Sequence, residues 1–180
     1  IDIQWCIEPA GGVENVVSFI SEKTISELDT YYPNILAEKT ISLPDALSQI
    51  NTAVGKKFII IIDEWDVLIR DESANAKVQK DYINFLRGMF KGTEPTKYIL
   101  LAYLTGILPI KKEKTQSALN NFDEFTMLSA SILAPYIGFT ENDVHYLAEK
   151  YSLDFHEVQR WYDGYFLNDF HIYNPKAVVS

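Results

Sequence analysis

Residues 58–64 read FIIIIDE, five apolar residues followed by two carboxylates. An apolar run without alternation, rich in β-branched side chains, is typical of a strand that is covered on both faces at the centre of a parallel sheet. The acidic pair Asp63-Glu64 falls where the chain leaves that sheet. Open α/β sheets bind their ligands at this edge, outside the carboxyl ends of the strands. The stretch therefore predicts an α/β fold and the place of a site.

A second apolar run supports a parallel sheet. Residues 98–104 read YILLAYL, and apolar residues at helical spacing fill the interval between the two runs. These are Val78, Tyr82, Phe85, Leu86 and Met89. Strand, helix and strand in this order predict a βαβ unit with a right-handed crossover.

The first 55 residues predict one strand and two helices. Ile1, Ile3 and Trp5 alternate with polar residues, which predicts a short strand with one buried face. Apolar residues then recur at helical spacing over about 13–31 and again over 42–55. Ser42 is the expected cap of the second helix, with Asp45 three residues later.

The last third of the chain changes character and predicts short capped helices. We therefore expect two domains, an α/β core over 1–135 and a small helical subdomain over 136–180. Trp161, Tyr162 and Tyr165 in the second part either form a peptide-binding surface or supply the core of a small subdomain. We favour the core, because a small subdomain needs large side chains to bury enough area.

The net charge, the cysteine count and the length of the apolar runs restrict the classes of protein to which the chain can belong. The 180 residues carry 16 basic and 25 acidic side chains, for a net charge of −9. This charge argues against direct nucleic-acid binding by this segment, because phosphate neutralisation needs a basic face. One cysteine excludes an internal disulfide. No apolar run approaches the ~20 residues that span a bilayer, so we expect a cytoplasmic protein that contacts no membrane.

The residues at the two strand ends suggest phosphoryl chemistry. In P-loop nucleotide hydrolases, an apolar strand ending in two acids is the Walker B arrangement. The first acid holds Mg²⁺ and the second polarises the attacking water, which are the roles expected here for Asp63 and Glu64. Thr105 follows the second strand, where a hydroxyl can sense the γ-phosphate. The same residues also have purely structural explanations, as a solubilising strand end, a helix cap and a turn.

A basic cluster and a spacing suited to an ion pair lie close to these strand ends in the sequence. Lys111 and Lys112 belong to the densest basic cluster, which either faces phosphate or forms a solvated loop. Asp66 and Arg70 are four residues apart, so we expect an ion pair across one helical turn, worth a few tenths of a kcal/mol.

Several separated motifs together resemble the bacterial AAA-ATPase-like family. They are IIDEWD at 61–66, LTGILPI at 104–110, NN at 120–121, GFTE at 138–141, WYDGY at 161–165 and YNP at 173–175. The resemblance implies a P-loop NTPase-like core that uses Mg²⁺ and ATP, followed by a small helical region. Members of the family are often joined to a C-terminal nuclease-like domain of the PD-(D/E)XK type.

One family feature is missing. Members carry a Walker A loop, Gly-x-x-x-x-Gly-Lys-Ser/Thr, and these 180 residues contain none. The resemblance then implies a fragment with an incomplete core. Asp63 would bind metal, Glu64 and Thr105 would be catalytic, and Lys111 and Lys112 would contact nucleotide, with hydrolysis only in the full-length protein.

Alternative functions stay open. One is a non-enzymatic protein-interaction module, and another is a metal-dependent, nuclease-associated domain that uses Asp63, Glu64 and Asp66. The strand that precedes the Walker A loop in such sheets is missing as well. Its absence should leave the strand at 98–104 with an exposed edge, which predicts self-association.

Overall fold

The chain divides into two compact units. A computed structural model describes residues 1–40, 42–109, 119, 121–126, 129–167 and 169–179. The contacts separate Ile1–Phe122 from Asp123–Ser180. The sequence predicted a boundary near residue 135, whereas residues 123–135 group with the second unit.

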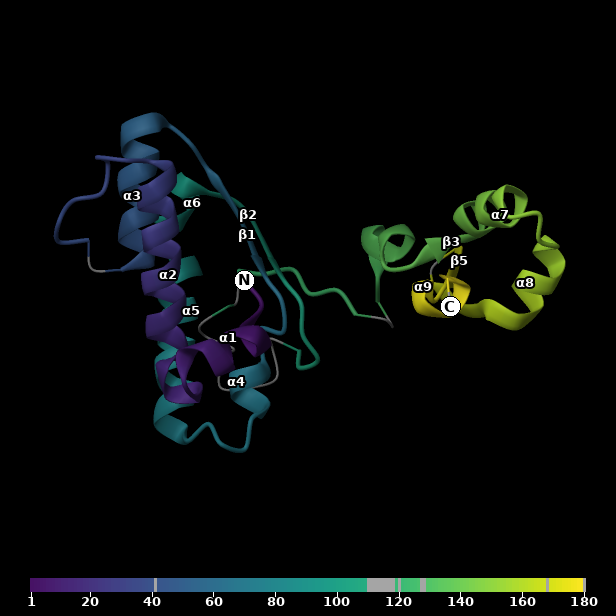
Figure 1. Ribbon diagram of the computed structural model, residues 1–180, viewed down its shortest axis with the longest axis horizontal. Helices are drawn as coiled ribbons and strands as arrows, with labels where there is room; N and C mark the ends of the chain where they lie inside the picture. The colour runs from purple at the N-terminus through teal and green to yellow at the C-terminus, as the bar shows by residue number, and fades with distance from the viewer. Residues whose placement is uncertain (41, 110–118, 120, 127–128, 168, 180) are drawn as a thin grey trace. The chain divides into compact units, whose positions relative to one another are not determined.

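The first unit places helices against a small parallel sheet (Figure 1). The strands β1 (Phe58–Ile62) and β2 (Ile99–Leu104) pair in parallel, so the predicted strand–helix–strand unit is confirmed. The helical elements are α1 (Ile3–Ala10), the 3-10 turn η1 (Val13–Asn15), α2 (Val16–Tyr31), α3 (Leu43–Val54), α4 (Val67–Arg70), α5 (Ala76–Phe90) and α6 (Pro95–Tyr98).

The core of this unit lies on one face of the sheet. Helices α2, α3 and α5 run side by side there (Figure 1). Helix α3 begins as predicted, because the Ser42 hydroxyl accepts a hydrogen bond from the Asp45 N–H at 3.3 Å. Ile62, Leu47 and Leu86 are 2% exposed or less. Full burial of such a side chain stabilises the fold by about 1.5–3 kcal/mol.

The other face of the sheet is exposed, which corrects the prediction of a strand covered on both sides. Ile59 and Ile61 of β1 are 57% and 55% exposed. Their register partners on β2, Leu101 and Tyr103, are 54% and 45% exposed. The prediction failed because an apolar run shows that a face can be covered but not what covers it. Within the described residues, helices cover one face alone.

The first residues also depart from the prediction. The expected strand around Ile1 and Ile3 is limited to one parallel bridge, between Asp2 and Asp63. Helix α1 then begins at Ile3, because the Asp2 carboxylate caps it by accepting the Trp5 N–H at 2.9 Å. The bridge still matters for the sheet: Ile3 N–H donates to the Asp63 carbonyl at 3.1 Å, on the opposite side of β1 from β2.

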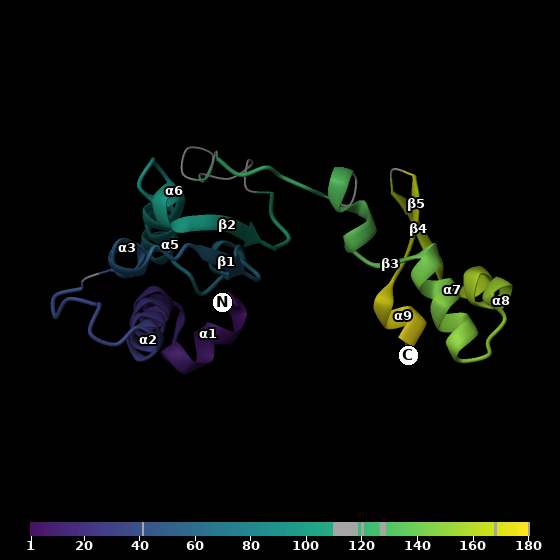
Figure 2. The same ribbon diagram turned by 90° about the horizontal axis from the view of Figure 1, so that it is seen from above.

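The second unit combines helices with a sheet, so the prediction of a helical subdomain was incomplete. Strands β3 (Phe139–Thr140), β4 (Asp163–Leu167) and β5 (Phe170–Tyr173) form an antiparallel sheet in the order β3-β5-β4. Around them lie η2 (Ser131–Tyr136), α7 (Glu141–Lys150), α8 (Phe155–Tyr162) and α9 (Pro175–Val179), as Figure 2 shows from above. Across both units, none of the described helices combines the length and apolar character needed to cross a membrane.

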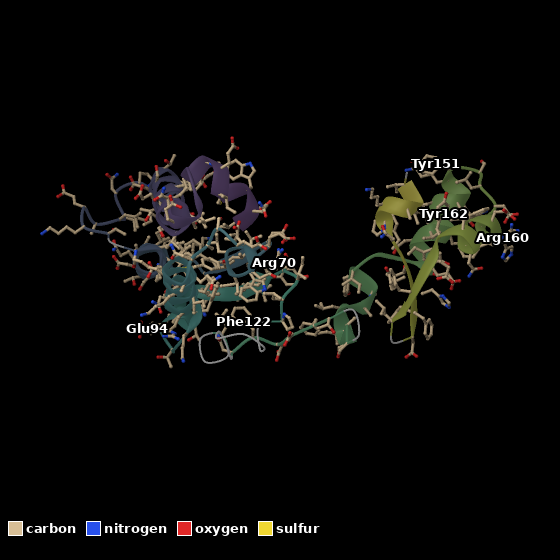
Figure 3. The ribbon with its side chains drawn as sticks, turned by 90° about the horizontal axis from the view of Figure 1, so that it is seen from below. Arg70, Glu94, Phe122, Tyr151, Arg160 and Tyr162 are labelled. Carbon is tan, nitrogen blue, oxygen red and sulfur yellow. The ribbon has the colours of Figure 1, made fainter. Side chains whose placement is uncertain are left out.

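The three aromatic residues that the sequence predicts as core of this unit are not buried. Trp161 is 70% exposed, Tyr162 41% and Tyr165 49%. The favoured interpretation, that they supply buried area, was therefore wrong. Val144 and Tyr173 are fully buried instead, which leaves Trp161 and Tyr162 of α8 and Tyr165 of β4 at the surface (Figure 3 labels Tyr162).

A buried tyrosine fixes the chain just after β1. The hydroxyl of Tyr82, on α5, donates a hydrogen bond to the Trp65 carbonyl at 2.7 Å. Burial, helped by the carboxylate of Asp66, raises the pKa of Tyr82 well above its usual range. The hydroxyl therefore keeps its proton and stays a donor.

Replacing this tyrosine tests the packing that positions the strand end. We expect Tyr82→Phe to lower the free energy of unfolding by about 1–2 kcal/mol, because the change removes a buried hydrogen bond but keeps the ring. Urea denaturation measures the difference. Tyr31→Phe is the matched control, since Tyr31 is 81% exposed, and a change within about 0.5 kcal/mol is expected there. Equal losses in both variants would contradict the assignment.

Candidate functional site

The two parallel strands end side by side and bring polar residues together. Thr105 N–H donates to the Ile62 carbonyl at 2.9 Å, and Trp65 N–H donates to the Thr105 carbonyl at 2.9 Å. The backbone hydrogen bonds between the two chain segments thus continue just beyond the ends of β1 and β2. At that step the Thr105 hydroxyl donates a hydrogen bond to Asp63 Oδ1. The carboxyl edge of the sheet therefore carries a carboxylate and a hydroxyl in direct contact.

Glu64 stands next to this contact on a sharp turn. Its φ is 53°, in the left-handed region that non-glycine residues adopt infrequently. Its N–H donates to Asp63 Oδ1 at 3.1 Å. The side chain is 41% exposed, and its Oε2 accepts a hydrogen bond from Arg70 Nη2 at 2.7 Å. The turn thus carries a second carboxylate out of the sheet beside the first.

Asp66 is fully buried beneath the same turn. Its Oδ2 accepts hydrogen bonds from the backbone N–H groups of Ile107 at 3.2 Å and Leu108 at 2.7 Å. The same oxygen accepts from Arg70 Nε at 2.8 Å. Among the described residues, Asp66 Oδ1 has no hydrogen-bond partner. One buried carboxylate thus ties the turn after β1 to the loop after β2.

The loop after β2 passes close to this carboxylate. A Cβ added at Gly106 would lie 2.5 Å from Asp66 Oδ1 and 2.7 Å from Trp65 Cδ1. Both distances are far below van der Waals contact. Glycine is therefore required at position 106 for a steric reason, because a side chain there would push the loop away from Asp66.

The arrangement suits a cation bound together with its ligand. Asp63 is an exposed carboxylate, and hard cations such as Mg²⁺ prefer oxygen ligands. In the part of the chain that the structure describes, no group of three or more His, Cys, Asp and Glu side chains is placed to hold a metal ion. A single carboxylate of this kind can supply one oxygen ligand to a cation whose other ligands would come from water or a bound ligand.

The structure brings together three of the five residues that the sequence predicts for a Mg-ATP site. Asp63, Glu64 and Thr105 lie at one edge of the sheet. Lys111 and Lys112 lie outside the described residues. What the sequence missed is the burial of Asp66. The pairing of Asp66 with Arg70 was predicted from their spacing. The other donors to Asp66 are backbone N–H groups some forty residues later in the chain, and a pattern of side chains does not reveal them.

Comparison with known proteins yields a family and one relative of low identity. A family model described as "Predicted AAA-ATPase" matches residues 10–115. A protein of Azotobacter chroococcum mcd 1, described as "Uncharacterized protein in vnfD 5'region", is 27% identical over 134 residues. That match covers 73% of this chain and 26% of the relative, so the chain spans about a quarter of the relative's length. No solved structure matches the chain.

The close approach at Gly106 gives a stability test. We expect Gly106→Ala to destabilise the fold by about 1–3 kcal/mol, because the new methyl group overlaps Asp66 and Trp65. Gly88→Ala is the matched control. Gly88 lies inside α5 with nothing near an added Cβ, so alanine should raise stability by about 0.5–1 kcal/mol. Thermal or urea unfolding measures both, and a neutral Gly106→Ala would contradict the geometry.

Proposed function

The chain belongs to the AAA-ATPase-like family, and from this premise we propose that the carboxyl edge of β1 and β2 is part of a site that binds and hydrolyses Mg-ATP. The observation that carries the proposal is the contact between Thr105 and Asp63, with Glu64 next in the chain. A metal-binding carboxylate, a carboxylate for the water and a hydroxyl for the phosphate are the groups that this reaction needs at a strand edge.

Asp63 is the proposed metal residue. Its carboxylate binds Mg²⁺ directly or through a water molecule, and the phosphates of ATP supply further oxygen ligands. The contact from Thr105 orients one carboxylate oxygen, Oδ1. The second oxygen then has capacity for the ion or its water shell.

Glu64 is the proposed residue that polarises the attacking water. Its Oε2 is bound by Arg70, which leaves the second carboxylate oxygen with capacity to accept a hydrogen bond from that water. The Thr105 hydroxyl is the proposed sensor of the γ-phosphate, and its one proton would turn from Asp63 Oδ1 to a phosphate oxygen when ATP binds. In phosphoryl transfer the protein contributes mainly positioning and electrostatic stabilisation.

The grip on the phosphates is proposed to come from outside these 180 residues. The sequence contains no Gly-x-x-x-x-Gly-Lys-Ser/Thr loop, and the chain spans about a quarter of its relative, 26%. Lys111 and Lys112 remain proposed nucleotide contacts. We therefore expect no measurable hydrolysis by the chain alone. The cytoplasm, where Mg-ATP is available and Cys6 stays reduced, is the proposed compartment.

The complete gene product is the protein on which to test this proposal. Glu64→Gln should lower kcat for Mg-ATP by about a hundredfold or more, because the general base is lost, while Mg-ATP still binds. Asp63→Asn should instead raise the Mg²⁺ concentration needed for half-maximal rate. A coupled phosphate-release assay at varied Mg²⁺ measures both effects.

Glu94→Gln is the matched control for this assay. Glu94 is a surface residue that pairs with Lys97 at 2.7 Å, away from the proposed site, and Figure 3 labels it. Its variant should hydrolyse ATP like the wild type. If Glu64→Gln also did so, the proposed role of Glu64 and with it the proposed function would be wrong.

A protein-interaction module is the second candidate, and exposed apolar surface favours it. The face of the sheet formed by Ile59, Ile61, Leu101 and Tyr103 is about half exposed. In the nuclease alternative, Asp66 would be a metal ligand. Its burial and its three hydrogen bonds leave it poorly suited to that role.

Self-association of the 180-residue chain tests the second candidate. We expect concentration-dependent association at micromolar concentrations, because apolar strands with an uncovered face and edge pair with other chains. Sedimentation velocity measures it, and Ile61→Lys together with Tyr103→Lys should shift the chain to monomer. Lys77→Gln, a surface change on α5, should leave association unchanged. A clean monomer of the unmodified chain would contradict this prediction.

A further inference from the structure

One arginine side chain joins the two carboxylates that follow the Walker B aspartate. Arg70 is the last residue of α4 and is labelled in Figure 3. Its Nη2 lies 2.7 Å from Glu64 Oε2, and its Nε lies 2.8 Å from Asp66 Oδ2. Because the guanidinium is planar and rigid, two contacts through different nitrogens fix its orientation as well as its place.

The anchor of this arginine is the buried carboxylate. Asp66 is 0% exposed, and its Oδ2 also accepts the N–H groups of Ile107 and Leu108. These two residues belong to the loop that directly follows Thr105. The position of Arg70 is therefore set by the same carboxylate that holds the loop after β2.

The other contact of Arg70 restrains a side chain that would otherwise move. Glu64 is 41% exposed on a left-handed turn with φ 53°. A half-exposed glutamate without a partner samples several rotamers, and ordering such a side chain costs conformational entropy. Arg70 binds one carboxylate oxygen and so selects one orientation before any ligand arrives.

We infer that Arg70 is a positioning residue for Glu64, and this inference rests on the proposed function. Arg70 couples the orientation of the water-polarising carboxylate to the loop that carries Thr105, with Asp66 as the common anchor. A purely structural role for Arg70 would require only its contact with Asp66, which compensates a buried charge. Positioning requires both contacts at once.

Two variants of Arg70 separate these roles in the complete gene product. Arg70→Lys keeps a positive charge near Asp66 but lacks the planar fork that reaches both carboxylates. Arg70→Gln removes the charge. We expect Arg70→Lys to unfold at nearly the same urea concentration as the wild type and Arg70→Gln at a lower one.

The kinetic readout should not follow stability. We expect both variants to lower kcat by about tenfold to a hundredfold, because misplacing a catalytic group costs that much, and to leave KM for Mg-ATP within about threefold. Arg160→Gln is the matched control. Arg160 forms an exposed pair with Glu157 at 3.4 Å on α8, and its variant should keep wild-type kcat.

A double variant decides whether Arg70 acts through Glu64. Adding Arg70→Gln to Glu64→Gln should lower kcat no further, because the carboxylate to be positioned is already absent. A further loss equal to that of Arg70→Gln alone would overturn the inference. If Arg70→Lys had both the kcat and the stability of the wild type, the inference would also be overturned, because charge compensation of Asp66 would then suffice. Wild-type hydrolysis by Glu64→Gln would instead overturn the proposed function itself.

Discussion

The buried carboxylate of Asp66 is the interaction on which the strand ends depend. A carboxylate removed from water is costly unless charged and polar donors compensate it. Asp66 meets this requirement through one of its oxygens, Oδ2, with Arg70 and with two backbone N–H groups from the loop after β2. Those donors lie on separate segments, so satisfying one buried charge holds the turn after β1 and the loop after β2 together. The contact between Asp63 and Thr105 joins the same two segments that Asp66 holds together.

The sequence predicted the parallel pair of strands, because a run of β-branched residues, a helical interval and a second apolar run leave few alternatives. It also predicted the neighbourhood of Asp63 and Thr105 and the spacing of Asp66 with Arg70. It could not predict that Asp66 is buried. The partners that decide its burial are backbone N–H groups, and every residue except proline has one.

Two predictions failed because a local pattern has more than one explanation. Alternation at Ile1, Ile3 and Trp5 suggested a strand, whereas the Asp2 cap and the left-handed Gly11 define helix α1. The isoleucine run suggested burial on both faces, whereas one face of β1 is exposed among the described residues. At β1 the side chains were assigned correctly as apolar, but the elements that could cover its two faces lie beyond a local sequence window.

The central claim is that the carboxyl ends of β1 and β2 hold Mg²⁺ and the γ-phosphate. The most direct test is a crystal structure of the complete gene product with Mg²⁺ and a non-hydrolysable ATP analogue. We predict Mg²⁺ bound to Asp63 directly or through one water, with the γ-phosphate within hydrogen-bonding distance of Thr105 and a water molecule at Glu64. Nucleotide bound at another place, with no metal ion at Asp63, would contradict the account.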